Sequence, residues 1–171
     1  MGAKDHHEHA DAVGPARCAV FSVSDSKTVA TDESGRLALE ILAKFGHTVI
    51  EHRIVPNDRK KISHAVAAAL HGEADLVITI GGTGISKRDI SIESVREFLQ
   101  KELPGFGELF RAMSQKEIGT AAMMSRAVLG VTEKGKVLVC TPGSPAAVRL
   151  AIEGILVNEL KHVLWELKRY G

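Results

Sequence analysis

Four segments of the sequence place polar or glycine-rich residues where a predicted strand ends. Ser24-Asp25-Ser26 and Pro56-Asn57-Asp58 follow the first two predicted strands, and Gly81-Gly82-Thr83-Gly84 follows the third. The stretch from Thr141 to Pro145 joins a later strand to a helix. Ligands of open α/β sheets bind outside the carboxyl ends of the strands. If the sheet is parallel there, the four segments converge on one edge, where we predict a ligand site.

The Gly81-Gly82-Thr83-Gly84 loop removes side chains where a strand ends, so its backbone N–H groups can approach an anion closely. It matches neither the Walker A pattern, since no GK[ST] follows, nor GxGxxG. Taken alone, a plain tight turn explains it equally well. Lys87-Arg88-Asp89 follows the loop and favours the phosphate interpretation. These residues offer cations for phosphate and a carboxylate for Mg²⁺, which takes one or two protein carboxylates plus phosphate oxygens.

Pro142-Gly143-Ser144-Pro145 is a second candidate anion cradle. Gly143 permits close approach of the backbone, and Pro145 suits the first turn of a helix, whose N-terminus attracts anions. An ordinary connection between a strand and a helix is an equal alternative.

Other polar residues have simpler explanations by spacing alone. Thr31 or Asp32 offers an N-cap for the first predicted helix, and Asp58 is placed to cap the second. Glu108 and Ser114 lie on a predicted helix whose polar face is solvated. The histidines form no recognisable triad or ligand pair. There is no GxSxG elbow and no positioned cysteine nucleophile, and without a Walker lysine a generic nucleotide hydrolase is disfavoured.

Strands alternate with helices along the chain, which predicts a three-layer α/β/α sandwich around a mostly parallel sheet. A hairpin across Glu133-Lys134-Gly135-Lys136 would make the sheet mixed. Pro104-Gly105-Phe106-Gly107 is interpreted as a break before a helix. From apolar periodicity and capping residues, strands are predicted at 18–23, 48–55, 75–80, 128–132 and 137–141, and helices at about 32–45, 59–70, 91–100 and 108–117 and from 145 onward.

The composition is that of an ordinary globular protein of 171 residues. Residues 1–15 are polar and are predicted to form a flexible, histidine-bearing arm before a single domain at 16–171. A formal net charge of only +1 argues against nucleic-acid binding. No apolar stretch reaches the roughly 18 residues of a membrane span. Cys18 and Cys140 lie in apolar strands, which favours free thiols and a cytoplasmic location.

Four motifs follow one another between about Arg17 and Gly154. They are Ser22-Val23-Ser24-Asp25 with Asp32-Glu33-Ser34-Gly35, then Gly81-Gly82-Thr83-Gly84 with Asp89, then Pro104-Gly105-Phe106-Gly107-Glu108, and finally Pro142-Gly143-Ser144-Pro145. Together, in this order, they resemble the MoaB/MogA family, which also includes the G domain of gephyrin-type proteins. The stretch from Glu117 to Val128 is closer to MoaB than to MogA.

The resemblance implies a molybdopterin-binding-domain-like fold and a role in molybdenum or tungsten cofactor biosynthesis. It implies Mg²⁺-dependent adenylylation of molybdopterin by ATP, releasing pyrophosphate, and self-association as a trimer or hexamer. Asp89 matches a functionally important aspartate of the family and is assigned to Mg²⁺ or to substrate positioning. The predicted catalytic residues are Asn57, Asp58 and Asp89, and the predicted substrate-binding residues are Ser24, Asp25, Gly81, Gly82, Thr83, Gly84, Lys87, Glu108, Ser114, Pro142, Gly143, Ser144 and Pro145.

One position departs from the family pattern. Adenylylating members often carry an aspartate where this chain has Asn57, followed by Asp58. Asparagine keeps hydrogen bonding but loses the charge that would hold a cation. Two hypotheses follow: either Asp58 substitutes and the chain is an adenylyltransferase, or it binds and delivers molybdopterin without catalysis.

Overall fold

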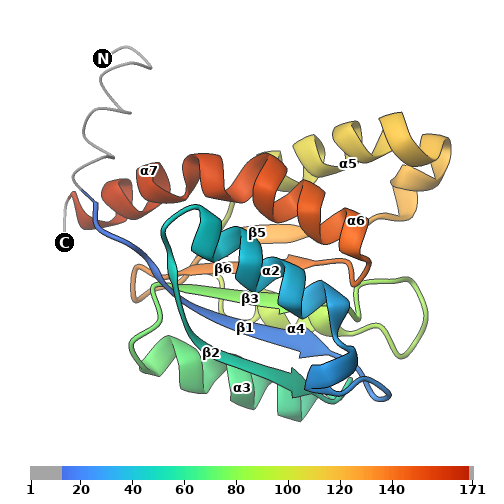
Figure 1. Cartoon of the computed structure of the whole chain (residues 1–171), viewed down its shortest axis with the longest axis horizontal. Helices are drawn as coiled ribbons and strands as arrows, with labels where there is room; N and C mark the ends of the chain where they lie inside the picture. The colour runs from blue at the N-terminus through green and yellow to red at the C-terminus, as the bar shows by residue number, and fades with distance from the viewer. Residues whose placement is uncertain (1–12, 170–171) are drawn as a thin grey trace.

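The computed structural model describes residues 13–169, which form one mixed sheet of six strands in the order β2-β1-β3-β6-β5-β4 (Figure 1). The first four strands in that order are mutually parallel, whereas β5 is antiparallel to β6 and β4 is antiparallel to β5. The strands are β1 (Arg17–Val23), β2 (Thr48–Val55), β3 (Leu76–Ile80), β4 (Lys101–Glu102), β5 (Val128–Val131) and β6 (Val137–Thr141).

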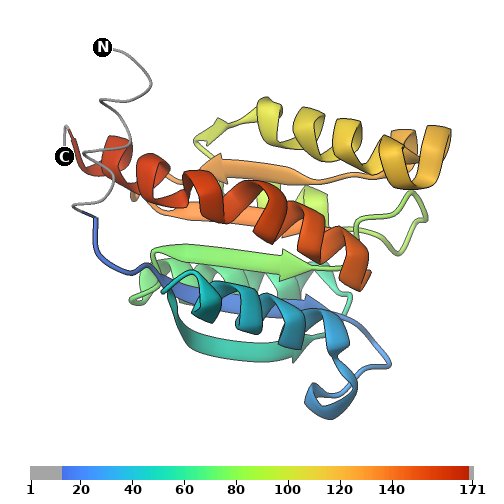
Figure 2. The same cartoon turned by 45° about the horizontal axis from the view of Figure 1, so that its top comes forward.

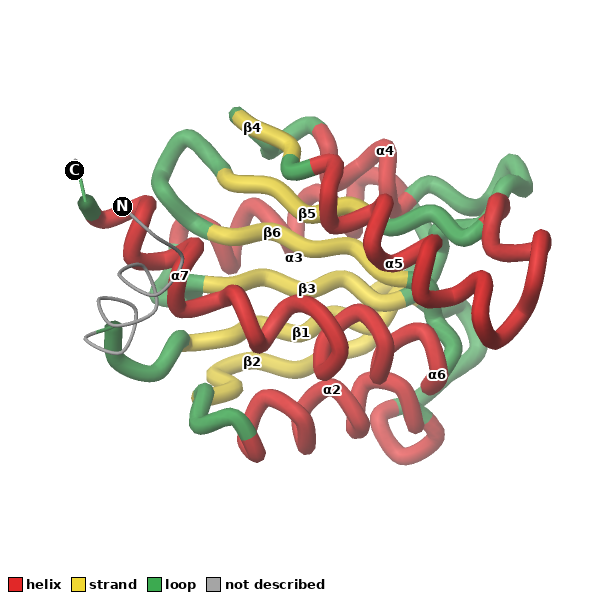
Figure 3. Tube along the Cα trace, turned by 90° about the horizontal axis from the view of Figure 1, so that it is seen from above, coloured by secondary structure: helices red, strands yellow, loops and turns green. Residues whose placement is uncertain are grey.

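Helices cover both faces of the sheet, so the predicted three-layer sandwich is confirmed (Figure 3). One face carries α2 (Glu33–Lys44), α5 (Pro104–Ile118) and the C-terminal helices, while the other carries α3 (Arg59–His71) and α4 (Ser91–Arg96). Figure 2 shows the C-terminal helices lying lengthwise beside α2. Two short 3₁₀ turns, η1 (Val29–Thr31) and η2 (Gly119–Met124), complete the connections.

Each face has its own hydrophobic core, because successive strand residues point to opposite sides of the sheet. Cys18 and Val20 of β1 pack with α2, whereas Ala19 and Phe21 pack with α3. All five residues of β3 are buried, as expected of a central strand covered on both faces. This burial holds β1, β3 and β6 rigidly, and their carboxyl ends therefore lie at fixed positions along one edge.

Two aspartates begin the helices that follow β1 and β2. Asp32 caps α2 by accepting a hydrogen bond from the Gly35 N–H at 3.1 Å. Asp58 caps α3 in the same way, accepting from the Lys61 N–H at 3.0 Å. Both caps satisfy amide groups that have no partner inside the helix.

The structure corrects two helix boundaries predicted from the sequence and adds one strand. Helix α5 begins at Pro104 instead of after Gly107, because proline at the first helical position needs no N–H partner. A Cβ atom at Gly107 would lie 3.0 Å from the Ala127 carbonyl oxygen, so glycine permits close packing there. Helix α4 ends at Arg96. The two-residue β4 was not predicted, because so short a strand has no periodicity.

The C-terminal helices form one continuous run after β6. It begins with α6 (Pro145–Val148), continues as a π-helical segment, η3 (Arg149–Leu156), and ends with α7 (Val157–Lys168). Val157, Leu160 and Leu164 of α7 are buried in the core.

Cys18 and Cys140 are buried free thiols. Within residues 13–169, no helix combines the length and apolar character needed to cross a membrane.

Candidate functional site

A cavity of about 480 Å³ lies at the carboxyl ends of β1, β3 and β6, where the sequence predicted a ligand site. Three of the four predicted segments contribute to its wall. The lining residues are Ser22, Val23, Ser24, Lys27, Asp32, Ile80, Gly81, Gly82, Thr83, Gly84, Asp89, Met124, Ser125, Arg126, Pro142 and Gly143.

The floor of the cavity is backbone, because the two glycine loops touch. The Gly81 N–H donates to the Thr141 carbonyl at 2.9 Å. A Cβ atom at Gly143 would lie 3.2 Å from Gly81 Cα, and one at Gly81, where φ is +100°, would lie 2.8 Å from the Val23 carbonyl oxygen. Gly81 has no room for a side chain, and one at Gly143 would press against the Gly81 backbone. The ends of three strands therefore meet closely enough for a ligand to lie directly against main chain.

Helix α2 is tied to the second glycine loop by Ser34. This residue is fully buried, and its hydroxyl donates to the Gly143 carbonyl at 2.7 Å across 109 positions of the chain. Ser144 begins the C-terminal helices, and its hydroxyl accepts from the Ala147 N–H at 3.2 Å. The N-terminal ends of two helical segments are thus held beside the cavity.

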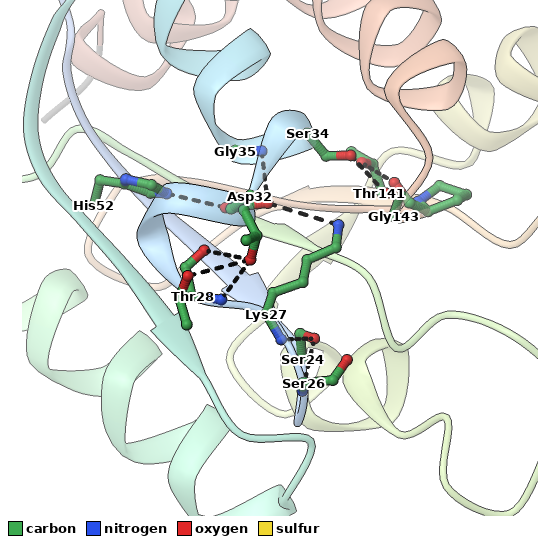
Figure 4. A network of polar contacts seen from close by, with 12 residues as sticks. Ser24, Ser26, Lys27, Thr28, Asp32, Ser34, Gly35, His52, Thr141 and Gly143 are labelled. Atoms are coloured by element: carbon green, nitrogen blue, oxygen red, sulfur yellow. Dashed lines mark hydrogen bonds and ion pairs between the residues drawn. The ribbon is translucent and has the colours of Figure 1, made fainter.

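Asp32 lines the cavity and is fully buried. Besides its bond to Gly35, its carboxylate lies 3.2 Å from His52 Nε2 and 3.7 Å from the Lys27 ammonium (Figure 4). Burial by itself would raise the pKa of Asp32. The neighbouring Ser22 hydroxyl, the Gly35 N–H, His52 and the charge of Lys27 outweigh that effect and hold the pKa below its ordinary value. The cavity therefore contains an ionised aspartate at neutral pH.

Asp89 also lines the cavity and closes the loop that follows the glycines. Its carboxylate accepts from the Ser86 hydroxyl at 2.6 Å and from the Ser86 N–H at 3.1 Å. The Ser86 hydroxyl is the main reason that the pKa of Asp89 is lowered. The backbone N–H groups of Ser86 and Gly84 and the charge of Arg126 lower it further, against a weaker opposing effect of burial. A second ionised carboxylate thus faces the cavity.

Arg126, which also lines the cavity, binds the carbonyl groups of the glycine loop. Its Nε donates to the Thr83 carbonyl at 2.9 Å and its Nη2 to the Gly84 carbonyl at 2.8 Å. Its Nη1 forms an ion pair with Glu93 at 2.6 Å. The planar guanidinium group spans all three acceptors at once, so Arg126 fixes the conformation of the loop.

The structure brings half of the predicted site residues to the cavity wall and leaves the others outside it. The predicted residues on the wall are Ser24, Gly81, Gly82, Thr83, Gly84, Asp89, Pro142 and Gly143; those that do not line it are Asp25, Asn57, Asp58, Lys87, Glu108, Ser114, Ser144 and Pro145.

The residues outside the wall have other neighbours. Asp25 accepts from the Asn57 N–H at 2.9 Å and pairs with Arg88 at 2.8 Å, while Asp58 caps α3. The buried Ser114 hydroxyl donates to the Phe110 carbonyl within α5, which also carries the exposed Glu108. Lys87 is exposed in the loop before Asp89.

Sequence reasoning missed three charged residues of the cavity wall: Lys27, Asp32 and Arg126. Asp32 was interpreted as a possible helix cap and as part of a family motif, and was not predicted as a site residue. Lys27 and Arg126 are single basic residues in loops, and only their distant contacts distinguish them. The available signal for Asp32 and Arg126 was their position within stretches that resemble the MoaB/MogA family.

The Asp89 carboxylate on the cavity wall and the oxygen atoms next to Gly82 are of the kind that Mg²⁺ takes together with phosphate. The described residues contain no group of three or more His, Cys, Asp or Glu side chains that could hold a metal ion. Asp89 supplies one carboxylate. Asn57 Oδ1 and Ser91 Oγ are buried without hydrogen-bond partners, and a Cβ atom at Gly82 would lie 3.0 and 2.3 Å from them. One or two carboxylates, completed by phosphate and water, are what Mg²⁺ uses.

Residues 19–162 match the family described as "Probable molybdopterin binding domain". Molybdenum cofactor biosynthesis protein B of Bacillus anthracis is 48% identical over 155 residues, covering 90% of this chain and 91% of that protein.

Solved structures are also similar. A crystal structure of a molybdenum cofactor biosynthesis protein B superposes with a TM-score of 0.88 at 46% identity, over 91% of this chain and 97% of that one. The tungsten cofactor synthesizing protein MoaB from Pyrococcus furiosus superposes with a TM-score of 0.82 at 37% identity, over 90% of this chain and 98% of that one.

Proposed function

This chain belongs to the molybdopterin-binding family of MoaB and MogA, whose members act in molybdenum and tungsten cofactor biosynthesis, and we propose that it transfers an adenylyl group from ATP to molybdopterin. The names of its relatives include both metals, so the proposal covers either pathway. A cytoplasmic location and assembly into trimers or hexamers belong to the same proposal.

The observation that carries the proposal is the backbone floor made by the Gly81 and Gly143 loops, with Asp89 on the wall. In the proposed reaction an oxygen of the terminal phosphate of molybdopterin attacks the α-phosphorus of ATP. A new P–O bond forms, and the bond breaks between the α-phosphorus and the oxygen that bridges it to the β-phosphorus. Pyrophosphate leaves with the electron pair of that bond.

This transfer requires alignment and charge neutralisation, and no protein nucleophile. The chain fits that requirement. Its two cysteines are buried, and burial is the main reason that the pKa of each thiol is raised to about 12, so neither supplies a thiolate. The glycine loops let phosphate groups approach the main chain, and Arg126 keeps the first loop in place.

Asp89 has the role of orienting the nucleotide and its cation. Its carboxylate is held by Ser86 and stays ionised, so its orientation is set before any ligand binds. Mg²⁺ bound with ATP would neutralise phosphate charge next to this carboxylate.

The test is an incubation of the purified protein with molybdopterin, ATP and Mg²⁺, followed by chromatography for adenylylated pterin. We expect Mg²⁺-dependent product with the wild type. We expect a rate at least about tenfold lower with Asp89→Asn, because the amide loses the charge that orients the cation. Glu133→Gln, in the exposed turn at the opposite edge of the sheet, is the matched control. An Asp89→Asn variant that reacts at the wild-type rate would refute the role of Asp89.

A second candidate function is binding and delivery of molybdopterin without catalysis. Asn57 favours it, because this position carries no charge and Asp58 is occupied in capping α3. The buried Asn57 Oδ1 also has no hydrogen-bond partner. Calorimetry separates the two candidates: tight pterin binding without affinity for Mg-ATP would select the carrier function. Recovery of product formation in Asn57→Asp would then identify this residue as the cause.

A further inference from the structure

Two cations line the cavity, and their contacts differ. Arg126 directs its guanidinium group at two carbonyls of the glycine loop and at Glu93. The Lys27 ammonium lies 3.7 Å from one oxygen of Asp32, a loose pairing that leaves donors for another partner. Its side chain is 37% exposed, so a ligand in the cavity can reach it. Lys27 is therefore the cation available to an anionic ligand.

The turn after β1 sets the position of Lys27. The Ser24 hydroxyl accepts from the N–H groups of Ser26 and Lys27, at 3.3 and 3.1 Å. Figure 4 shows the Lys27 side chain extending from this turn toward Asp32 at the N-terminus of α2. Ser24 lines the cavity as well. The turn thus holds the backbone of Lys27, and the Asp32 carboxylate holds its ammonium group.

Asp32 is a rigid anchor for the ammonium group. It is fully buried, and both of its oxygens have partners, the Gly35 N–H on one and His52 on the other. A buried charge is tolerated when it is paired and hydrogen bonded. These contacts fix the Asp32 carboxylate in this structure, so it can orient the Lys27 ammonium group before a ligand binds.

We propose that Lys27 binds a phosphate group of the substrate in this cavity and that Asp32 is the positioning residue for its ammonium group. This inference rests on the proposed function, since it takes the ligand of the cavity to be a phosphate ester or a polyphosphate. Lys27 takes the phosphate-binding role that the sequence had indicated for Lys87. Lys87 is exposed and does not line the cavity.

A purely structural role makes a different prediction. If Lys27 only neutralises the buried Asp32, removing the ammonium should lower stability and leave phosphate affinity unchanged. If it binds phosphate, affinity should fall and depend less on salt, because one protein–phosphate charge contact is lost. The measurement therefore needs both a binding readout and a stability readout.

The experiment is calorimetric titration of the full chain with inorganic pyrophosphate at two salt concentrations, accompanied by thermal melting. We expect Lys27→Met to bind pyrophosphate about tenfold or more weakly, the effect of losing one hydrogen bond to a charged group. Lys27→Arg keeps the charge and should retain most of the affinity. Lys134→Met, in the turn between β5 and β6 at the opposite edge of the sheet, makes the same change in charge and should bind like the wild type.

Asp32→Asn tests the anchor. Asparagine is as good a helix cap as aspartate, so α2 keeps its N-terminal hydrogen bond. We expect weaker pyrophosphate binding that Lys27→Met does not weaken further, because both substitutions remove the same oriented ammonium group. If the losses of pyrophosphate affinity add in the double variant Asp32→Asn/Lys27→Met, the positioning role of Asp32 is overturned.

Four results would overturn the assignment of Lys27: wild-type affinity in Lys27→Met, a loss as large in Lys134→Met, a loss found in Lys87→Met instead, or no pyrophosphate binding by the wild type at millimolar concentration. If Lys27→Met fails to fold, Lys27→Gln replaces it.

The adenylylation assay tests the proposed function independently of pyrophosphate binding. Pyrophosphate binding that needs Lys27 without adenylylated product leaves this inference standing and refutes the enzyme. Product formation with an unchanged KM for Mg-ATP in Lys27→Met refutes this inference alone.

Discussion

Replacing Arg126 with methionine should loosen the glycine loop that forms part of the cavity wall. Methionine keeps much of the apolar stem of arginine and removes the guanidinium group. The Thr83 and Gly84 carbonyls then lose donors at 2.9 and 2.8 Å, and Glu93 loses its ion pair. The loop is left with hydrogen bonds that are mostly local, such as those between Ser86 and Asp89.

The expected loss in stability follows from the burial of these groups. The ion pair joins side chains that are 31% and 44% exposed, so it contributes at most about 1 kcal/mol. A hydrogen bond to a charged group contributes roughly 1.5–3 kcal/mol. Water in the cavity can replace the donor at the partly exposed Gly84, which reduces the loss. We therefore expect Arg126→Met to lower the free energy of unfolding by about 2–3 kcal/mol.

Urea unfolding of two further variants separates the contributions. Glu93→Gln removes the charge partner and leaves both carbonyl contacts, so it should cost less than about 1 kcal/mol. Arg126→Lys keeps the charge but cannot reach both carbonyls and Glu93 at once. Its free energy of unfolding should therefore lie closer to that of Arg126→Met than to that of the wild type. Amide hydrogen exchange at residues 83–90 should accelerate in Arg126→Met and stay near the wild-type rate in Glu93→Gln. If Arg126→Met and Glu93→Gln lose the same stability, the carbonyl contacts contribute nothing and the reasoning is refuted.

Two further predictions concern the N-terminal end of α2. Ser34→Ala should lower the free energy of unfolding by about 1–2 kcal/mol, because the Gly143 carbonyl loses its buried donor. Ser63→Ala, which removes a buried hydroxyl without a partner, should cost less in the same urea titration. For Asp32 the lowered pKa means that its contribution is fully present above the unfolded pKa of about 3.9 and is lost as the pH falls through the native pKa. The stability difference between wild type and Asp32→Asn should therefore be largest near neutral pH and shrink below about pH 4, and a difference independent of pH would contradict the lowered pKa.

The sequence alone determined the elements of the fold and their arrangement in layers. Strands at 48–55 and 137–141 were predicted with the bounds that the structure has, and the hairpin that makes the sheet mixed was also predicted. Asp32 and Asp58 were both identified as possible helix caps. These features were predictable because they depend on apolar periodicity and on hydrogen bonds between residues three or four positions apart.

The edge of the sheet that carries the cavity could be predicted from the sequence, because parallel strands present their carboxyl ends together. The glycine loops and Asp89 lie on its wall, although their roles in binding stay predictions. The residue types of Asn57, Asp58 and Lys87 suggested chemistry as strongly as that of Asp89. The spacing of Asp58 indicated a helix cap, whereas nothing in the spacing of Asn57 or Lys87 indicated that neither of them lines the cavity.

Tertiary structure decided which charged groups face the cavity. Ser34 meets Gly143 from 109 positions away, and Arg126 reaches Thr83 from 43 positions away. Such contacts depend on how three strands and two helix ends pack together. Local periodicity contains no information about that packing, because it depends only on residues a few positions apart in the chain. The pairing of Lys27 with a buried Asp32 arises in the same way, because only the packed structure turns a helix cap into the anchor of a cation.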